Sequence, residues 1–318
     1  MSKSIELYDK SGKSRSTKLL AHPYLPLIFS ATPNNSICCW DLTTKSILYI
    51  LEVVPGEQAQ PMVAHTDWIR SLAFDPSGKF LLSGSNDTTV TVWNLEDLHK
   101  TRVVGRHWNN ITSVIWDNTG LMFATGSSDT TIKIWDAVTY EWLQCIEAHN
   151  SRVECLTSHP SKGMFASGSG DKSIMVWDWR TGENLVTLRE HSYSVTTLVS
   201  NENYIISGSL DKTIRIWNWP TETRKTKSSI RILDMDYTGY YEMILLENKL
   251  VYKIDRDTIR ITDLLDINPS KWESKEVKLD VSSDYNIHIS LIPTAVDSSL
   301  KLVYGGTTLG HKIYIQDL

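Results

Sequence analysis

The chain alternates apolar and polar residues over many short segments. One example is residues 131–135, Thr-Ile-Lys-Ile-Trp, in which successive side chains differ in polarity. Alternation with a period of two is typical of a half-buried β-strand, and it does not fit the 3.6-residue period of an amphipathic helix. Residues 124–127 form a second short run, and the Ser-x-Asp-x-Thr segment between the two runs has the composition of a tight turn. The pattern therefore predicts a chain of β-hairpins.

The hairpin pattern recurs at a regular interval. Trp93, Trp135 and Trp177 are 42 residues apart, and Trp217 follows 40 residues later. Each clear copy has an apolar residue, then Ala, Leu or Ile, then Ser or Thr, Gly, Ser, any residue and Asp, followed by an alternating run that ends in Trp. A repeat of about 40–45 residues is typical of the four-stranded blades of a β-propeller. The four clear copies are Leu81–Asn94, Phe123–Asp136, Phe165–Asp178 and Ile205–Asn218, and a less regular fifth copy is Phe29–Asp41.

A histidine recurs with the same period, because His65, His107, His149 and His191 are 42 residues apart. Regularly spaced histidines also suggest metal ligands. However, a metal site needs ligands that converge on one ion, and one histidine per blade places them in separate blades. We therefore favour a hydrogen-bonded set within each repeat, in which buried His and Asp side chains offset the cost of desolvation by pairing with each other. No metal or cofactor is expected.

These motifs resemble the WD-repeat (tryptophan-aspartate) β-propeller family. The second repeat shows the likeness in His107, the segment Thr125-Gly-Ser-Ser-Asp129 and the pair Trp135-Asp136. The Gly that usually precedes the family's histidine is absent, since Ala, Arg or Glu stands there. The resemblance implies a structural tetrad of His, Ser or Thr, Asp and Trp in each clear repeat: His65, Ser83, Asp87 and Trp93; His107, Thr125, Asp129 and Trp135; His149, Ser167, Asp171 and Trp177; and His191, Ser207, Asp211 and Trp217.

The resemblance implies an all-β fold, a single seven-bladed β-propeller of four-stranded blades over residues 1–318. The last two blades lack the tetrad, with Thr262 and Gln316 in the Trp position. The seventh blade also lacks its outermost strand, which the alternating segment at residues 4–8 can supply; this pairing would close the ring. The expected blades span about 17–53, 65–105, 107–147, 149–189, 191–235, 241–280 and 286–318.

Composition and charge disfavour several classes of protein. A chain with 41% hydrophobic and 22% charged residues is typical of a globular protein rather than a disordered one. The net charge of -5 argues against a strongly basic nucleic-acid binder. There is no apolar run long enough to cross a membrane, no signal-peptide core, and no paired cysteine motif. We therefore expect a cytoplasmic or nuclear protein without membrane insertion.

Catalytic motifs are missing from the sequence. It contains no GxSxG elbow, no HExxH pair and no phosphate-binding glycine loop. We therefore predict that the protein is not an enzyme but a scaffold or adaptor, a monomeric propeller that binds peptides or proteins within a multiprotein complex. A propeller enzyme is the alternative, because a fold alone does not exclude catalysis.

The resemblance implies that partners bind the rim around the central channel, next to the tetrads. Trp68 and Arg152 are the leading candidates, because Trp and Arg dominate interface hot spots. The competing interpretation of Trp68 is a side chain that packs over its neighbouring blade. The predicted rim set is Trp68, Arg70, Asn86, Trp108, Asn110, Ser128, Arg152, Glu154, Tyr193, Ser194 and Leu210.

Two narrower functions are also open. The segment Trp177-Asp-Trp-Arg180 matches a WDxR signature with which some WD-repeat proteins dock the adaptor of a cullin-RING ubiquitin ligase, and Arg180 would be the contact. The alternative for Arg180 is a solvated residue that begins a turn at Thr181-Gly182. The other function is membership of an RNA-processing or chromatin complex through protein partners, since a pI near 6.0 disfavours direct nucleic-acid contact.

The segment 220–229 is short, basic and rich in hydroxyl groups. A charge run of this size is typical of a solvated turn, and the alternative is a binding or phosphorylation element.

Overall fold

The computed structural model describes residues 5–8, 18–32, 34–51, 53–54, 62–63, 65–98, 101–221, 228–229, 231–234, 243–246, 248–254, 258–264, 274–278, 287–293, 300–306 and 312–317. All the extended regular elements in these ranges are β-strands, which confirms the all-β prediction. The described ranges hold no helix of the length and apolarity that crossing a membrane requires. Residue 4 of the predicted N-terminal strand and most of the 220–229 segment lie outside the described residues.

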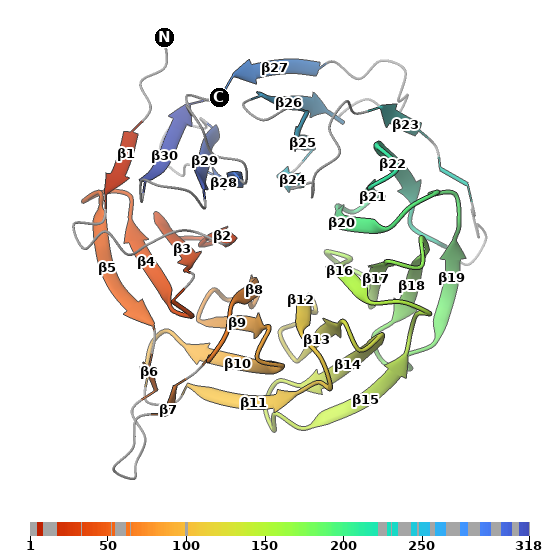
Figure 1. The fold of residues 1–318 in the computed structure, drawn as a ribbon, viewed down its shortest axis with the longest axis horizontal. Coiled ribbons are helices and arrows are strands. Elements are labelled where there is room, and N and C mark those ends of the chain that lie inside the picture. Colours follow the sequence, from red (N-terminus) through yellow and green to blue (C-terminus); the bar gives the residue numbers. More distant parts are fainter. Residues whose placement is uncertain are drawn as a thin grey trace. The chain divides into compact units, whose positions relative to one another are not determined.

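The chain divides into two compact units, residues 1–111 with 280–318, and residues 112–279. The first unit contains three four-stranded antiparallel sheets and a short two-stranded one (Figure 1). Their strands are β2 (Lys18–Ala21), β3 (Leu27–Ala31), β4 (Ile37–Asp41) and β5 (Ser46–Leu51); β8 (Ile69–Phe74), β9 (Phe80–Ser85), β10 (Thr89–Asn94) and β11 (Arg102–Arg106); β28 (Ile287–Pro293), β29 (Leu300–Gly306), β30 (Lys312–Asp317) and β1 (Ile5–Tyr8); and the pair β6 (Val53–Val54) and β7 (Met62–Val63).

The second unit contains four further sheets, each made of four strands that follow one another in the chain. Every strand is antiparallel to its neighbour, as short hairpin connections require. The strands are β12 (Ile111–Trp116), β13 (Met122–Ser127), β14 (Thr131–Asp136) and β15 (Trp142–Glu147); β16 (Val153–Ser158), β17 (Met164–Ser169), β18 (Ile174–Asp178) and β19 (Asn184–Leu188); β20 (Val195–Ser200), β21 (Tyr204–Ser209), β22 (Thr213–Asn218) and β23 (Arg231–Asp234); and β24 (Met243–Leu246), β25 (Lys249–Lys253), β26 (Thr258–Asp263) and β27 (Ser274–Lys278).

The prediction of a closed seven-bladed ring is corrected by this topology. Six sheets are blades of four consecutive strands, so the repeat itself accounts for six blades rather than seven. The remaining four-stranded sheet is of another kind, because only three strands follow β27 and the fourth, β1, comes from the other end of the chain. In that sheet β1 pairs with β30, with Ile5 opposite Ile315. This pairing lies within one compact unit, and closure of a ring is not shown.

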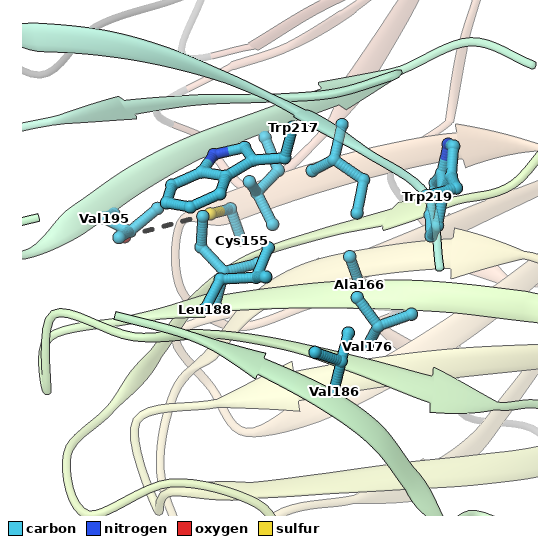
Figure 2. Close-up of a cluster of buried hydrophobic side chains, with 11 residues drawn as sticks. Cys155, Ala166, Val176, Val186, Leu188, Val195, Trp217 and Trp219 are labelled. Carbon is cyan, nitrogen blue, oxygen red and sulfur yellow. Dashed lines mark hydrogen bonds between the residues drawn. The ribbon is translucent and has the colours of Figure 1, made fainter. Parts of the chain in front are cut away.

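Neighbouring sheets within a unit pack face to face through apolar side chains. The sheets β16–β19 and β20–β23 share one such cluster, with Cys155 and Leu188 from the first sheet and Val195 and Trp217 from the second (Figure 2). The Cys155 thiol donates to the Val195 carbonyl across this contact, with 3.8 Å from Sγ to O. Full burial of a large apolar side chain contributes about 1.5–3 kcal/mol, so these contacts are a principal source of stability. Comparable clusters join β12–β15 to β16–β19, β20–β23 to β24–β27, and β2–β5 to β8–β11.

The glycines of two Thr/Ser-Gly-Ser motifs, Gly126 and Gly168, permit this close approach. A Cβ on Gly168 of β17 would lie 2.7 Å from Val195 Cγ1 of the next sheet, and a Cβ on Gly126 of β13 would lie 2.7 Å from Val153 Cγ1. Real Cβ atoms do not approach other carbons so closely, so a side chain at either position would force the sheets apart. The repeated motif thus determines the spacing between sheets as well as the turn.

Candidate partner-binding surface

The tetrad of the third repeat forms one continuous chain of hydrogen bonds. Trp177 Nε1 donates to Ser167 Oγ at 2.8 Å, and His149 Nε2 lies 2.8 Å from the same oxygen. His149 Nδ1 lies 3.0 Å from Asp171 Oδ2. A carboxylate can only accept, so Nδ1 donates to Asp171, and in the neutral ring Nε2 then accepts from the Ser167 hydroxyl. Both ring nitrogens are therefore occupied, which supports the structural interpretation of the repeat histidine over a metal ligand.

The first and fourth repeats reproduce this geometry. The His Nδ1 to Asp Oδ2 distance is 3.1 Å in the first repeat and 2.7 Å in the fourth. The Trp donor lies 2.8 Å and 2.9 Å from the Ser oxygen. In the second repeat, Trp135 Nε1 donates to Thr125 Oγ1 at 2.9 Å, and His107 is buried but belongs to the other compact unit. The less regular fifth copy keeps one of these bonds, from Trp40 Nε1 to Ser30 Oγ at 2.8 Å.

The tetrad carboxylates anchor the loops that carry the predicted rim residues. Burial alone would raise the pKa of Asp171, but hydrogen bonds from His149 and Ser173 more than offset it and hold the pKa well below its usual range. Asp171 Oδ2 also accepts the backbone N–H of Asn150 at 3.0 Å, which ties down the loop after the histidine. The same balance lowers the pKa of the tetrad carboxyl groups in the first and fourth repeats, at Asp87 and Asp211.

A second set of anchors was not predicted from the sequence. The serine two residues before each tetrad Asp is completely buried at Ser85, Ser169 and Ser209. Its hydroxyl donates to a backbone carbonyl of the histidine loop; Ser209 Oγ, for example, lies 3.1 Å from the oxygen of Tyr193. The repeated Gly-Ser-x-Asp motif contained this signal, because a hydroxyl at a fixed place in every copy needs a fixed partner.

The structure brings together three pairs of positions around the predicted rim. The residue before each tetrad Asp donates its backbone N–H to the histidine loop. The distances are 2.9 Å from Asn86 N to Trp68 O, and 3.0 Å both from Gly170 N to Arg152 O and from Leu210 N to Ser194 O. Ser194 Oγ in turn lies 3.5 Å from Gly170 O, so three segments of the second unit are linked in order: Arg152, Gly170 and Ser194. The predicted residues Asn110 and Ser128 belong to different units.

The predicted rim residues differ in how much of each side chain is exposed. Trp68 is 49% exposed, Tyr193 61% and Trp108 91%, so each leaves an aromatic surface open to solvent. Arg70 and Arg152 are exposed as well. Trp and Tyr are enriched at interface hot spots, so exposure keeps these three side chains as candidates for partner contacts. The remaining members are partly buried: Asn86, Asn110, Ser128, Glu154, Ser194 and Leu210.

Two charged contacts orient side chains on the surface of the second unit. Arg152 Nε donates to Glu154 Oε1, and the Glu154 side chain is only 9% exposed, so a mostly buried carboxylate positions an exposed guanidinium. Lys172 Nζ lies 5.7 Å from the ring centre of Tyr193, within range of a cation–π interaction. A cation and an aromatic ring therefore lie next to the linked segments in the chain. Lys172 is two residues after Gly170, and Tyr193 directly precedes Ser194.

Arg180 lies in a tight turn after β18. Its backbone N–H donates to Asp178 Oδ1 at 2.9 Å, Thr181 N donates to the same oxygen at 2.8 Å, and Gly182 has a φ of 66°. The Arg180 side chain is exposed. An exposed side chain at the start of a turn fits both a solvated residue and a contact with a ligase adaptor. The contact with a ligase adaptor stays a prediction.

Comparison with known proteins agrees with the repeat. The family model for the WD domain, G-beta repeat, matches residues 56–94, 99–136, 140–178 and 182–218. Mouse striatin is 33% identical over 86 residues, which are 27% of this chain and 10% of striatin, and human striatin-3 is 35% identical over 79 residues, 25% of this chain and 8% of that protein. The chain therefore matches only about a tenth of the length of these relatives.

The solved structure of U3-55K has a similar fold. It superposes with a TM-score of 0.78 over 99% of this chain and 98% of its own, at 15% sequence identity. Identity at that level shows the fold alone. The four matched repeats, with the hydrogen-bonded tetrads described in three of them, show that the chain belongs to the WD-repeat β-propeller family, whose fold generally serves as a scaffold for protein interactions.

Proposed function

We propose that the protein is a non-catalytic adaptor that captures a partner peptide on the segments linked by Gly170. The observation that carries this proposal is the hydrogen-bonded order of Arg152, Gly170 and Ser194, flanked by the exposed ring of Tyr193. Each segment is anchored by a tetrad or by a buried serine, so the surface is largely formed before a partner arrives. Preorganisation of this kind reduces the entropic cost of binding.

The chemistry of the surface suggests the kind of peptide. Lys172 supplies positive charge, Arg152 supplies a guanidinium whose charge is paired with Glu154, and Tyr193 supplies an aromatic face. Gly170 has no side chain, and a Cβ there would lie 2.7 Å from Ser151 Oγ, so the hydroxyl of Ser151 packs directly against this glycine. An extended peptide with acidic side chains and one apolar anchor is complementary to this arrangement.

The test replaces the proposed contacts and compares partner binding with a matched control. The double variant Arg152→Ala, Tyr193→Ala should weaken binding by at least about 30-fold, because loss of even one hot-spot contact costs about 2 kcal/mol. Trp142→Ala is the control, since Trp142 is 60% exposed but lies on the outer strand β15, away from the histidine loops.

Partners are first identified by affinity purification with mass spectrometry, and their affinities are then measured by isothermal titration calorimetry. The proposal requires partners that the Trp142 variant retains and the double variant loses, at unchanged melting temperature. Equal loss in both variants, or none in either, would contradict it.

A further inference from the structure

Glu190, which directly precedes the tetrad His191, accepts hydrogen bonds from the segment that leads into β23. Ser229 Oγ donates to Glu190 Oε2 at 2.6 Å, and Ser229 N lies 3.3 Å from both carboxylate oxygens. From β22, Arg215 Nη1 donates to the same Oε2 at 2.6 Å and lies 3.4 Å from Ser229 Oγ. One carboxylate oxygen is therefore shared by a serine hydroxyl and a guanidinium.

Arg215 does not use its full hydrogen-bonding capacity in this arrangement. Its side chain is 15% exposed, and its Nε is buried with no hydrogen-bond partner among the described residues. A guanidinium presents its N–H groups as a planar fork that matches two oxygens of a phosphate. The contact with Glu190 through Nη1 leaves Nε unsatisfied, and a buried donor without a partner is costly. Nε and Nη2 form the paired edge of the guanidinium, so a group with several acceptor oxygens on Ser229 would satisfy Nε once Arg215 turns this edge toward it.

The sequence around Ser229 is basic on both sides. Lys225 and Lys227 precede the serine, and Arg231 follows it by two residues. Protein kinases that select basic substrates recognise such flanks through charge complementarity. Ser228 is an adjacent hydroxyl with nearly the same flanks and is exposed, whereas Ser229 is the one that lies beside Arg215.

We propose that Ser229 is a phosphorylation site for a serine/threonine kinase that selects basic substrates. The phosphate on Ser229 then replaces Glu190 as the ion-pair partner of Arg215. In the transfer, Ser229 Oγ attacks the γ-phosphorus of ATP and forms the Oγ–P bond. The bond from the γ-phosphorus to the β,γ-bridging oxygen breaks, ADP leaves, and the hydroxyl proton passes to the base of the kinase. The product carries a charge of about -1.5 to -2 and three acceptor oxygens.

The existing contacts require an exchange of partners after phosphorylation. Burial alone would raise the pKa of Glu190, but hydrogen bonds from Ser229 and the charge of Arg215 lower it, so Glu190 is ionised at neutral pH. A phosphate on Ser229 removes the hydroxyl donor and places a second anion next to this carboxylate. Repulsion separates the two anions, and Arg215 turns its Nε and Nη2 edge to the phosphate, where two parallel N–H groups match two phosphate oxygens.

The acceptor is tested on the full-length protein with radiolabelled ATP and purified protein kinase C. We expect phosphate at Ser229 by mass spectrometry, at least about tenfold less incorporation in Ser229→Ala, and normal incorporation in Ser228→Ala; a tenfold change corresponds to about 1.4 kcal/mol. Equal labelling of the Ser229→Ala variant, or no labelling of the wild-type protein, would overturn the acceptor assignment.

The exchange of partners is tested on protein with phosphoserine genetically encoded at position 229, which does not depend on a kinase. We expect a phosphorus NMR titration to show a second phosphate pKa below the usual value of about 6, because Arg215 stabilises the dianion. Arg215→Gln should return the pKa to the usual value. Arg215→Lys, which keeps the charge but not the fork, should give an intermediate one. Identical titrations in the wild-type and both Arg215 backgrounds would overturn the exchange.

Discussion

At the scale of the residue, the tetrad turns contain backbone strain. The residue after the tetrad Asp has a left-handed backbone, with φ of 74° at both Thr88 and Thr130 and 73° at Lys172. This conformation costs an L-residue about 1–2 kcal/mol and is least suited to β-branched side chains, whereas Asn tolerates it. Thr130→Asn should therefore stabilise the protein by about 1 kcal/mol, measured as a higher urea midpoint. Lys172→Asn should gain less stability, because lysine is not β-branched. A lower urea midpoint for Thr130→Asn than for the wild-type protein would contradict backbone strain at this turn.

The tetrad carboxylates make stability depend on pH. The folded-state pKa of Asp171 is depressed relative to the unfolded chain, where it is about 3.9. The stability linked to this shift is fully present above the unfolded pKa and is lost as pH falls through the folded pKa. We therefore expect the free energy of unfolding to fall steeply below about pH 4. Asp171→Asn should be less stable at pH 7 but show a shallower acid slope, whereas the exposed control Glu183→Gln should retain the wild-type slope.

At the scale of the element, hydrogen-bonded groups that use the same residue type in every repeat were predicted from the sequence. Groups in which different residue types form the equivalent hydrogen bond were not. In the five sheets where the turn between the first and second strands is described in full, a side-chain acceptor caps it: His22, Asp75, Asp117, His159 or Asn201. Asp75 Oδ1 accepts from Phe80 N at 2.7 Å, and Asn201 Oδ1 accepts from Tyr204 N at 2.8 Å. At the same place His159 Nδ1 accepts from Ser161 N and Lys162 N, both at 3.1 Å.

The histidine caps are possible because of their surroundings. Burial lowers the pKa of His22 and His159, so their rings are neutral near pH 7 and Nδ1 can accept. No periodicity in residue type marks these caps, so the sequence did not reveal them. The tetrads were predictable because His, Ser or Thr, Asp and Trp recur at fixed spacing. The hydrogen bonds that link Arg152, Gly170 and Ser194 could not be predicted, because their backbone groups are present in every residue whatever its side chain.

At the scale of the whole molecule, the first unit depends on a strand contributed from far away in the chain. In its composite sheet β1 pairs with β30 along four residues, Ile5 to Tyr8 opposite Ile315 to Lys312. The alternating segment at residues 4–8 predicted this pairing, but counting the completed sheet as the seventh blade of a closed ring was wrong. The pairing protects backbone groups of β30 that would otherwise form an exposed edge.

Deletion of residues 1–17 should therefore speed up hydrogen exchange in the first unit and leave it unchanged in the second. Without β1, backbone N–H groups of β30 lose their carbonyl partners, so hydrogen exchange at residues 312–317 should accelerate about tenfold or more if local opening becomes about 1.4 kcal/mol easier. Exchange in β17, which lies in the other unit between β16 and β18, should not change.

A matched control replaces residues 9–17 by a Gly/Ser linker of the same length and retains β1. Uniform acceleration across both units would show that the strand acts on the whole chain, and unchanged exchange in β30 would show that its pairing contributes little.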